Sequence, residues 1–159
     1  MLSVFKKLFV PVVAICLTAA SDAAYADAPD PLVITMSPEL RVIERHGKDQ
    51  LVRYIPAKEV EQGQEIYYTV RIVNPTNEKV RRAVVIQAVP ANTRLVEKSV
   101  TGAGAALSYS IDGGKTFLSL TDLRNANATS SKVTHIRWQF RHPLAPHVIV
   151  LARFRVIFD

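Results

Sequence analysis

Strict alternation of apolar and polar side chains constrains this chain more than any other feature. In the stretch EIYYTVRIV, residues 65–73, every even-numbered residue from Ile66 to Ile72 is apolar, whereas Thr69 and Arg71 are polar. A period of two places the apolar side chains on one face of a β-strand and the polar side chains on the other. The stretch is therefore predicted to be a strand with one face on a hydrophobic core.

Short runs rich in β-branched and aromatic residues recur along the rest of the chain, with turn residues between them. No stretch after residue 26 has the pattern of a long amphipathic helix, and the polar residues 121–132 are predicted to form an exposed loop. Roughly nine or ten short strands at this spacing predict an all-β fold, an immunoglobulin-like antiparallel β-sandwich. The predicted strands cover residues 31–36, 40–45, 51–55, 65–73, 80–89, 95–100, 106–111, 115–120, 133–140 and 148–158.

The first 26 residues have the three parts of a cleavable secretory signal peptide. Lys6 and Lys7 give a basic start, residues 8–20 form an apolar run without charge, and the tripeptide A-Y-A ends at Ala26. The apolar run is 13 residues long, whereas a helix needs about 20 to span a bilayer. We expect cleavage after Ala26 and no stable transmembrane span in the mature chain.

The expected mature chain is basic and lacks cysteine. Cys16, the only cysteine of the sequence, lies in the apolar run, so no disulfide, thiol nucleophile or thiolate metal site is expected. Cleavage leaves 133 residues, enough for one domain with its own core. Loss of Lys6, Lys7 and Asp22 lowers the net charge from +6 to +5. This charge indicates an envelope protein or anionic envelope material as a partner, not nucleic acid, although solubility alone also explains it.

The order of motifs after residue 57 resembles the DUF11-type repeat domain of bacterial envelope proteins. In that family a glycine-containing turn precedes a Tyr-Thr strand, an asparagine ends the strand, and a Pro-Ala turn follows the next strand. The segment YSIDGGKTF is similar to a later hairpin of the family, and IRW to its late tryptophan strand. Two motifs depart from the pattern, because QAVP lacks the acidic residue that often precedes the turn and NPT replaces Asn-x-Gly. The matching positions are Gly63, Tyr68, Thr69, Asn74, Pro90 and Ala91.

The resemblance implies an immunoglobulin-like module of an exported or surface protein, and it implies no catalytic residues. Together with the predicted signal peptide, it divides the chain into three parts. These are the signal peptide (1–26), an N-terminal extension (27–56) whose strands pack on or join the sandwich, and an immunoglobulin-like, DUF11-type domain (57–159).

The glycine-rich stretch TGAGAALSYSIDGGKTF, residues 101–117, has some letters of a phosphate-binding loop. A P-loop requires a glycine five residues before the Gly-Lys-Thr at its end, and Tyr109 occupies that position. A dinucleotide fingerprint requires Gly or Ala where Leu107 stands. By contrast, Asp112-Gly113-Gly114 between alternating runs predicts a hairpin turn. Residues 101–107 are then a flexible loop, and Lys115 begins the returning strand.

The sequence contains no convincing catalytic or metal-binding motif. His135, His142 and His147 are conceivable zinc ligands, but their spacing fits no compact site and indicates surface histidines. No Gly-x-Ser-x-Gly elbow or carboxylate pair occurs. The sequon that begins at Asn127 matters only in a eukaryotic secretory pathway. We therefore expect no catalytic residue, no cofactor and no metal.

The last two predicted strands carry a basic strip on their polar faces. If residues 133–140 pair with 148–158 through the loop 142–147, Arg137 lies near Arg153, and opposed like charges are unfavourable. The strip is then either a solvated face with charges that prevent aggregation or a binding face for an anionic partner. Its residues are His135, Arg137, Arg141, Arg153 and Arg155.

The expected function follows from these features. We expect an exported, non-enzymatic envelope protein that acts through protein or glycan contact. We expect it in the periplasm, with secretion or the cell surface as the alternative. A second hypothesis is an assembly component that pairs a strand edge with a partner, and a more distant one is a hydrolase or metal enzyme.

Overall fold

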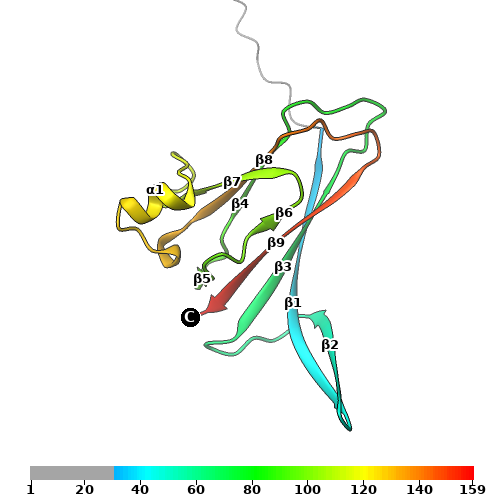
Figure 1. Ribbon diagram of the computed structural model, residues 1–159, viewed down its shortest axis with the longest axis vertical. Coiled ribbons are helices and arrows are strands. Elements are labelled where there is room, and N and C mark those ends of the chain that lie inside the picture. Colours follow the sequence, from blue (N-terminus) through cyan, green and yellow to red (C-terminus); the bar gives the residue numbers. More distant parts are fainter. Residues whose placement is uncertain (1–30) are drawn as a thin grey trace, which may run out of the picture.

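The strand predicted from alternation is β3 (Glu65–Val73), and it lies at the centre of the larger of two sheets. The computed structural model describes residues 31–159 and is shown in Figure 1. The larger sheet has the order β2-β1-β3-β9-β5, and β6 also pairs with β9. Its strands are β1 (Val33–His46), β2 (Asp49–Pro56), β3, β5 (Thr93–Leu95), β6 (Thr101–Gly102) and β9 (Ile149–Phe158).

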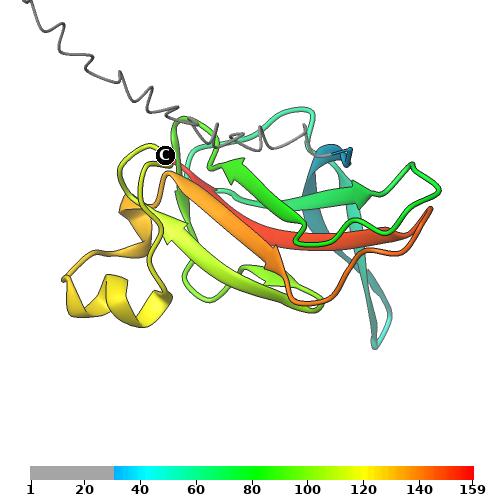
Figure 2. The same cartoon turned by 90° about the horizontal axis from the view of Figure 1, so that it is seen from above.

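The smaller sheet has three strands, in the order β4 (Val84–Ala88), β8 (His135–Phe140) and β7 (Ala105–Ser110). All strand pairs in both sheets are antiparallel. The helix α1 (Leu120–Asn125) lies beside β7 of this sheet, and the 3-10 helix η1 (Ser130–Lys132) lies near β5 of the larger sheet, at the same end of the molecule (Figure 2). The molecule is thus a two-layered, β-sandwich-like protein.

The core lies between the inner faces of the two sheets. Trp138 of β8 and Phe154 of β9 are fully buried, and their ring centroids lie 6.3 Å apart. Tyr68 of β3 stacks on Phe154, with centroids 5.1 Å apart. Full burial of a side chain of this size contributes about 1.5–3 kcal/mol. The largest fully buried apolar residues are Trp138, Phe154, Ile72, Leu123, Ile136, Val70, Val85 and Val156.

The prediction of an all-β, antiparallel fold is confirmed. The predicted N-terminal extension supplies β1 and β2, and β1 pairs with β3. The predicted signal peptide lies outside the described residues. Between residues 31 and 159, the structure contains no helix with the length and apolar character that crossing a membrane requires.

Several predicted strand boundaries are wrong. The runs 31–36 and 40–45 belong to one continuous strand, β1, although Pro38 lies between them. The Pro38 carbonyl accepts a hydrogen bond from the Ala57 N–H at 3.0 Å, on the side of β1 that faces away from β3. The Pro38 nitrogen faces the same side, so the missing N–H removes no hydrogen bond between β1 and β3. The predicted strand 80–89 is shortened to β4, and the predicted strand 95–100 shares only Leu95 with β5, which begins at Thr93.

The prediction of a loop over the polar segment 121–132 is also wrong, because most of this segment is helical. Ser119 caps α1 by accepting a hydrogen bond from the Asp122 N–H at 3.1 Å. Leu123 is buried and attaches the helix to the core. One buried leucine and one cap are enough to order this short helix, and neither produces a long amphipathic pattern.

Candidate functional site

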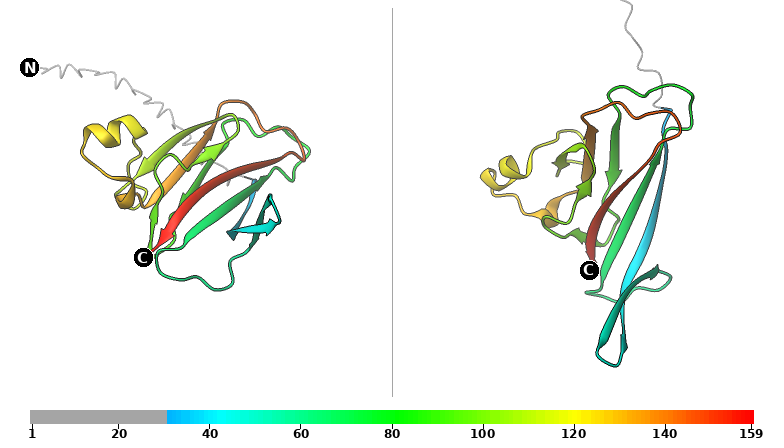
Figure 3. Two further views of the ribbon diagram at one scale, coloured as in Figure 1. Left: turned by 60° about the horizontal axis from the view of Figure 1, so that its bottom comes forward. Right: turned by 45° about the vertical axis from the view of Figure 1, so that its right-hand side comes forward.

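A two-stranded arm projects from one end of the larger sheet (Figure 1). β1 pairs with β3 only from Val33 to Glu39, and it pairs with β2 only from Glu39 to His46. Beyond Glu39, therefore, no third strand lies beside these two. We call residues 40–56 the arm. The right-hand view of Figure 3 shows the arm extending below the rest of the molecule.

The arm exposes several large apolar side chains to solvent. Every residue of β2 is exposed, and apolar side chains lie on both faces of the arm. Soluble monomers rarely leave a contiguous apolar patch exposed unless it has a use. The large exposed apolar residues of the arm are Ile43, Leu51, Val52, Tyr54 and Ile55.

The backbone of β2 has an open edge. The hydrogen bond from Ala57 N–H to Pro38 O continues the β1–β2 register. The backbone N–H and C=O groups of the odd-numbered residues of β2 therefore face β1. Backbone groups alternate in direction along an antiparallel pair. The N–H and C=O groups of Gln50, Val52 and Tyr54 therefore face away from β1, where β2 is the edge of the sheet.

The root of the arm is fixed to the sandwich. The ring of Tyr54 packs edge-on against Tyr67 of β3, with centroids 5.2 Å apart. The Thr69 hydroxyl donates a hydrogen bond to the Glu39 carboxylate at 2.9 Å. These contacts hold the exposed edge in a defined orientation.

The predicted basic strip is divided between the two sheets. β8 pairs with β4 and β7, whereas β9 pairs with β3, β5 and β6, so the predicted pairing of residues 133–140 with 148–158 is wrong. The loop between them crosses from one sheet to the other. His135 and Arg137 belong to β8 of the smaller sheet, and Arg141 comes directly after β8. Arg153 and Arg155 belong to β9 of the larger sheet. The expected opposition of Arg137 and Arg153 does not occur.

Two arginines of the strip already have partners within the chain. Arg155 Nη1 forms an ion pair with Glu65 at 2.8 Å, and its guanidinium lies 5.7 Å from the Tyr67 ring centroid. Arg137 Nε donates a hydrogen bond to the Ser108 hydroxyl at 2.8 Å, and its guanidinium lies over Phe117. Arg153 is exposed on the outer side of β9. The five residues therefore do not form one binding face.

The three C-terminal histidines do not converge. His147 Nε2 lies 2.9 Å from the Asn77 side-chain oxygen, while the ring of His135 lies against Gly114. Across residues 31–159, no three histidine, cysteine, aspartate or glutamate side chains gather closely enough to hold a metal ion.

The glycine-rich stretch forms the predicted turn but not the predicted returning strand. Gly113 and Gly114 have φ angles of 77° and 87°, the left-handed region that favours glycine. The Asp112 carboxylate accepts hydrogen bonds from the N–H groups of Lys115 and Thr116 at 3.0–3.1 Å. The chain therefore curls around Asp112, and only a single bridge from Tyr109 to Leu118 follows. The amides that a phosphate would need are already occupied by this carboxylate.

The prediction of a flexible loop over residues 101–107 is also wrong. Thr101–Gly102 forms β6, and Ala105 begins β7. A run of small residues often indicates flexibility, but here the small residues allow the backbone to pack closely on the core.

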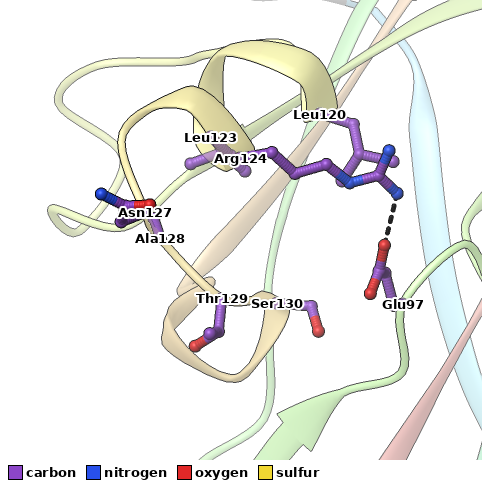
Figure 4. A pocket seen from close by; sticks show the side chains of 8 residues that line it. All are labelled: Glu97, Leu120, Leu123, Arg124, Asn127, Ala128, Thr129 and Ser130. Carbon is purple, nitrogen blue, oxygen red and sulfur yellow. Dashed lines mark hydrogen bonds and ion pairs between the residues drawn. The ribbon is translucent and has the colours of Figure 1, made fainter.

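One hollow lies between α1 and the segment before β6 (Figure 4). Arg124 and Glu97 form an ion pair across it, and the hydrogen bond from Arg124 lowers the pKa of Glu97. Both charged groups are thus bound to each other, and the remaining lining is mostly apolar or uncharged. The uncharged polar side chains of the lining are those of Asn127, Thr129 and Ser130. The lining residues are Glu97, Leu120, Leu123, Arg124, Asn127, Ala128, Thr129 and Ser130.

A second hollow, of about 430 Å³, collects basic side chains at the end of the smaller sheet. It contains Arg141, which belongs to the predicted basic strip, together with residues that the sequence placed in a strand. Two basic segments could have indicated this hollow from the sequence, namely KVRR (79–82) and FRH (140–142). Both stand where the alternation of apolar and polar residues stops. The hollow is lined by Lys79, Arg81, Arg82, Gln139, Phe140, Arg141, His142 and Pro143.

Comparison with protein-family models, with curated proteins and with solved structures finds no match for this chain. The resemblance to DUF11-type repeats therefore stays a prediction. The function must be inferred from the geometry of the arm and of the hollows.

Proposed function

We propose that this chain is an exported, immunoglobulin-like module of a bacterial envelope, resident in the periplasm, that works by protein contact and not by catalysis. The N-terminal sequence supports export, because residues 1–26 have the pattern of a signal peptide. Two layered sheets around a buried tryptophan support the immunoglobulin-like architecture. The observation that carries the proposal is the arm, with its open edge and exposed apolar faces.

The open edge of β2 is suited to adding a strand. Edge pairing supplies main-chain hydrogen bonds, and side chains on the two faces supply specificity. Proteins usually block such an edge with charges, proline, a bulge or a covering segment. Between its ends β2 has one charged side chain, Arg53, and this residue is held by a hydrogen bond to Glu44 at 2.9 Å.

A second copy of this chain fits the edge of β2. When two β2 strands run antiparallel about Leu51, Asp49 of each copy lies opposite Arg53 of the other. Opposite charges that face each other directly stabilise a strand pair by about 0.2–1 kcal/mol. The same register pairs Gln50 with Val52, whose backbone groups face the open edge. We propose that the module self-associates in this register.

A cysteine scan tests this register. In a full-length Cys16→Ser background, we expect Leu51→Cys to form a disulfide-linked dimer under mild oxidation, because the two positions lie directly opposite each other. Leu151→Cys is the matched control, since Leu151 is 48% exposed on a central strand and Leu51 is 51% exposed on the edge. It should remain monomeric under the same conditions.

A charge swap distinguishes pairing in this register from nonspecific association of the chain. Asp49→Arg places arginines opposite each other and should reduce the yield of the crosslink severalfold, and adding Arg53→Asp should restore it. Sedimentation velocity of the unmodified chain should show a concentration-dependent dimer. Equal crosslinking at positions 51 and 151, or a monomer at every concentration, would overturn self-association through β2.

A further inference from the structure

Two backbone segments, residues 80–83 and 140–144, border the second hollow. They are hydrogen-bonded to each other at both ends and diverge between these ends. At one end Val80 and Leu144 exchange two backbone hydrogen bonds of 3.0 and 2.9 Å. At the other end the Phe140 N–H donates to the Ala83 carbonyl at 3.0 Å. Arg81 and Arg82 lie between these ends on one segment, and residues 141–143 lie on the other. The opening is therefore a defined feature of the backbone.

Buried residues fix this frame. Ala83, Phe140 and Leu144 belong to the hydrophobic core. The Asn74 side chain is fully buried, and its Nδ2 donates hydrogen bonds of 2.7–3.2 Å to the carbonyl oxygens of Glu78, Leu144 and Ala145, next to both segments. The basic side chains thus project from a backbone that needs no ordering when a ligand binds.

The hollow is strongly cationic. Three arginines, one lysine and one histidine line it, and none of its lining residues is acidic. The ion pairs found across residues 31–159 involve none of Lys79, Arg81, Arg82 and Arg141. Clustered like charges repel one another, and a low-dielectric wall such as that of Phe140 concentrates their field. An anion would relieve this repulsion.

Arg82 also has an unusual backbone conformation. Its φ angle is 64°, in the left-handed region that arginine rarely occupies. Asparagine or glycine would suit this position better on conformational grounds. A strained backbone that places a guanidinium on the rim of a cationic hollow fits a role in binding.

We propose that this hollow is an oxyanion site that binds phosphate groups, with Arg81, Arg82 and Arg141 as its main ligands. A guanidinium donates two parallel hydrogen bonds to a phosphate, and several such groups on one frame recognise a multiply charged phosphate. The phosphate can come from a soluble phosphorylated compound or from a lipid headgroup. The site is independent of the β2 edge, so either proposal can fail without the other.

Titration calorimetry with pyrophosphate tests the site at low ionic strength. We expect saturable binding by the full chain, and a loss of at least tenfold in affinity for Arg82→Asn/Arg141→Gln, since a charged hydrogen bond contributes about 1.5–3 kcal/mol, or roughly tenfold or more. Arg71→Gln/Arg153→Gln removes the same charge from the outer face of the larger sheet and should weaken binding less than twofold. Arg82→Asn/Arg141→Gln should unfold at the same temperature as the parent or higher, so weaker binding cannot be ascribed to unfolding.

Vesicles distinguish the two sources of phosphate. Cosedimentation compares phosphatidylcholine vesicles with vesicles that also contain phosphatidic acid. Binding to phosphatidic acid that the Arg82→Asn/Arg141→Gln variant loses would support the site with a lipid phosphate as ligand. Absence of saturable binding to both probes, or equal loss in the two double variants, would overturn the proposal.

Discussion

Gly102 lies so close to the indole ring of Trp138 that no side chain fits between them. A Cβ atom at Gly102 would lie 2.5 Å from Cδ1 and 2.9 Å from Nε1 of the tryptophan. The indole N–H donates a hydrogen bond to the Thr101 carbonyl at 3.0 Å, which holds the backbone of β6 against the ring. The two-residue strand β6 therefore closes the core over its largest side chain.

Gly102→Ala should destabilise the fold by about 1–3 kcal/mol, because the added methyl group overpacks the ring and neither the indole nor the strand can move freely. Urea unfolding followed by tryptophan fluorescence measures the effect. Ala103→Ser adds one atom at the exposed neighbouring position and should change stability by less than about 0.5 kcal/mol. Equal stability of Gly102→Ala and the parent would show that β6 does not pack on Trp138.

Asn74→Ala should lower the free energy of unfolding by about 1–3 kcal/mol, because it removes the hydrogen bonds that the buried side chain donates to three carbonyl oxygens. Asn74→Asp should cost more, since a carboxylate would then face the carbonyl oxygens of Glu78, Leu144 and Ala145. Chemical denaturation measures both changes. The matched control is Asn77→Ala, whose side chain is exposed. Similar stability of the variants at positions 74 and 77 would contradict the stabilising role of the buried Asn74 side chain.

Asp112 should give the fold an acid-sensitive contribution. Hydrogen bonds from the hydroxyl groups of Ser110 and Thr116 and from backbone N–H groups hold the pKa of Asp112 well below its usual range. The stabilisation is therefore complete above the unfolded-state pKa of about 3.9 and is lost as pH falls from there through the folded pKa. Asp112→Ala should be less stable than the parent at neutral pH, and the difference should shrink in acid.

Urea unfolding at neutral pH and near pH 2 measures this difference. Asp112→Asn keeps an oxygen for the turn but has no titrating group, so the pH-dependent part of the difference should be the same for Asn and Ala. A gap between the parent and Asp112→Ala that is constant with pH would contradict the assignment.

The export proposal makes a prediction about the mature N-terminus. The chain recovered from the envelope fraction of an expressing bacterium should begin at Asp27, which intact-mass measurement detects. Ala26→Arg should block processing, since the cleavage pattern requires a small residue at this position. A mature chain that retains Lys6 and Lys7 would contradict cleavage at Ala26.

Local chemistry predicted individual elements of this fold well. The alternation from Ile66 to Ile72 predicted β3 and its buried face, because a half-buried strand has few other solutions. The turn at Gly113 and Gly114 agrees with the conformational freedom of glycine. The course of the chain after this turn was not predictable from propensity, since the Asp112 carboxylate captures the backbone amides that a returning strand would use.

Pairing between strands was harder to predict than the strands themselves. Trp138 and Phe154 belong to successive strands with the same alternation, and this pattern is compatible with neighbours in one sheet or with opposite layers. The structure places them in opposite layers, with their ring centroids 6.3 Å apart across the core. The predicted pairing of residues 133–140 with 148–158 is wrong for this reason, and the cationic hollow was missed because Arg82 and Arg141 come together only through tertiary structure.

The unbroken course of β1 has a mechanical consequence. β1 joins β3 through seven residue pairs, from Val33 to Glu39, and then continues into the arm. A force that pulls the arm along its own axis loads this ladder in shear, so that its hydrogen bonds resist together and do not open one after another. A partner that held the arm would pull directly on the centre of the larger sheet. The strand β1, which carries the open edge of β2, would thus make the attachment resistant to tension.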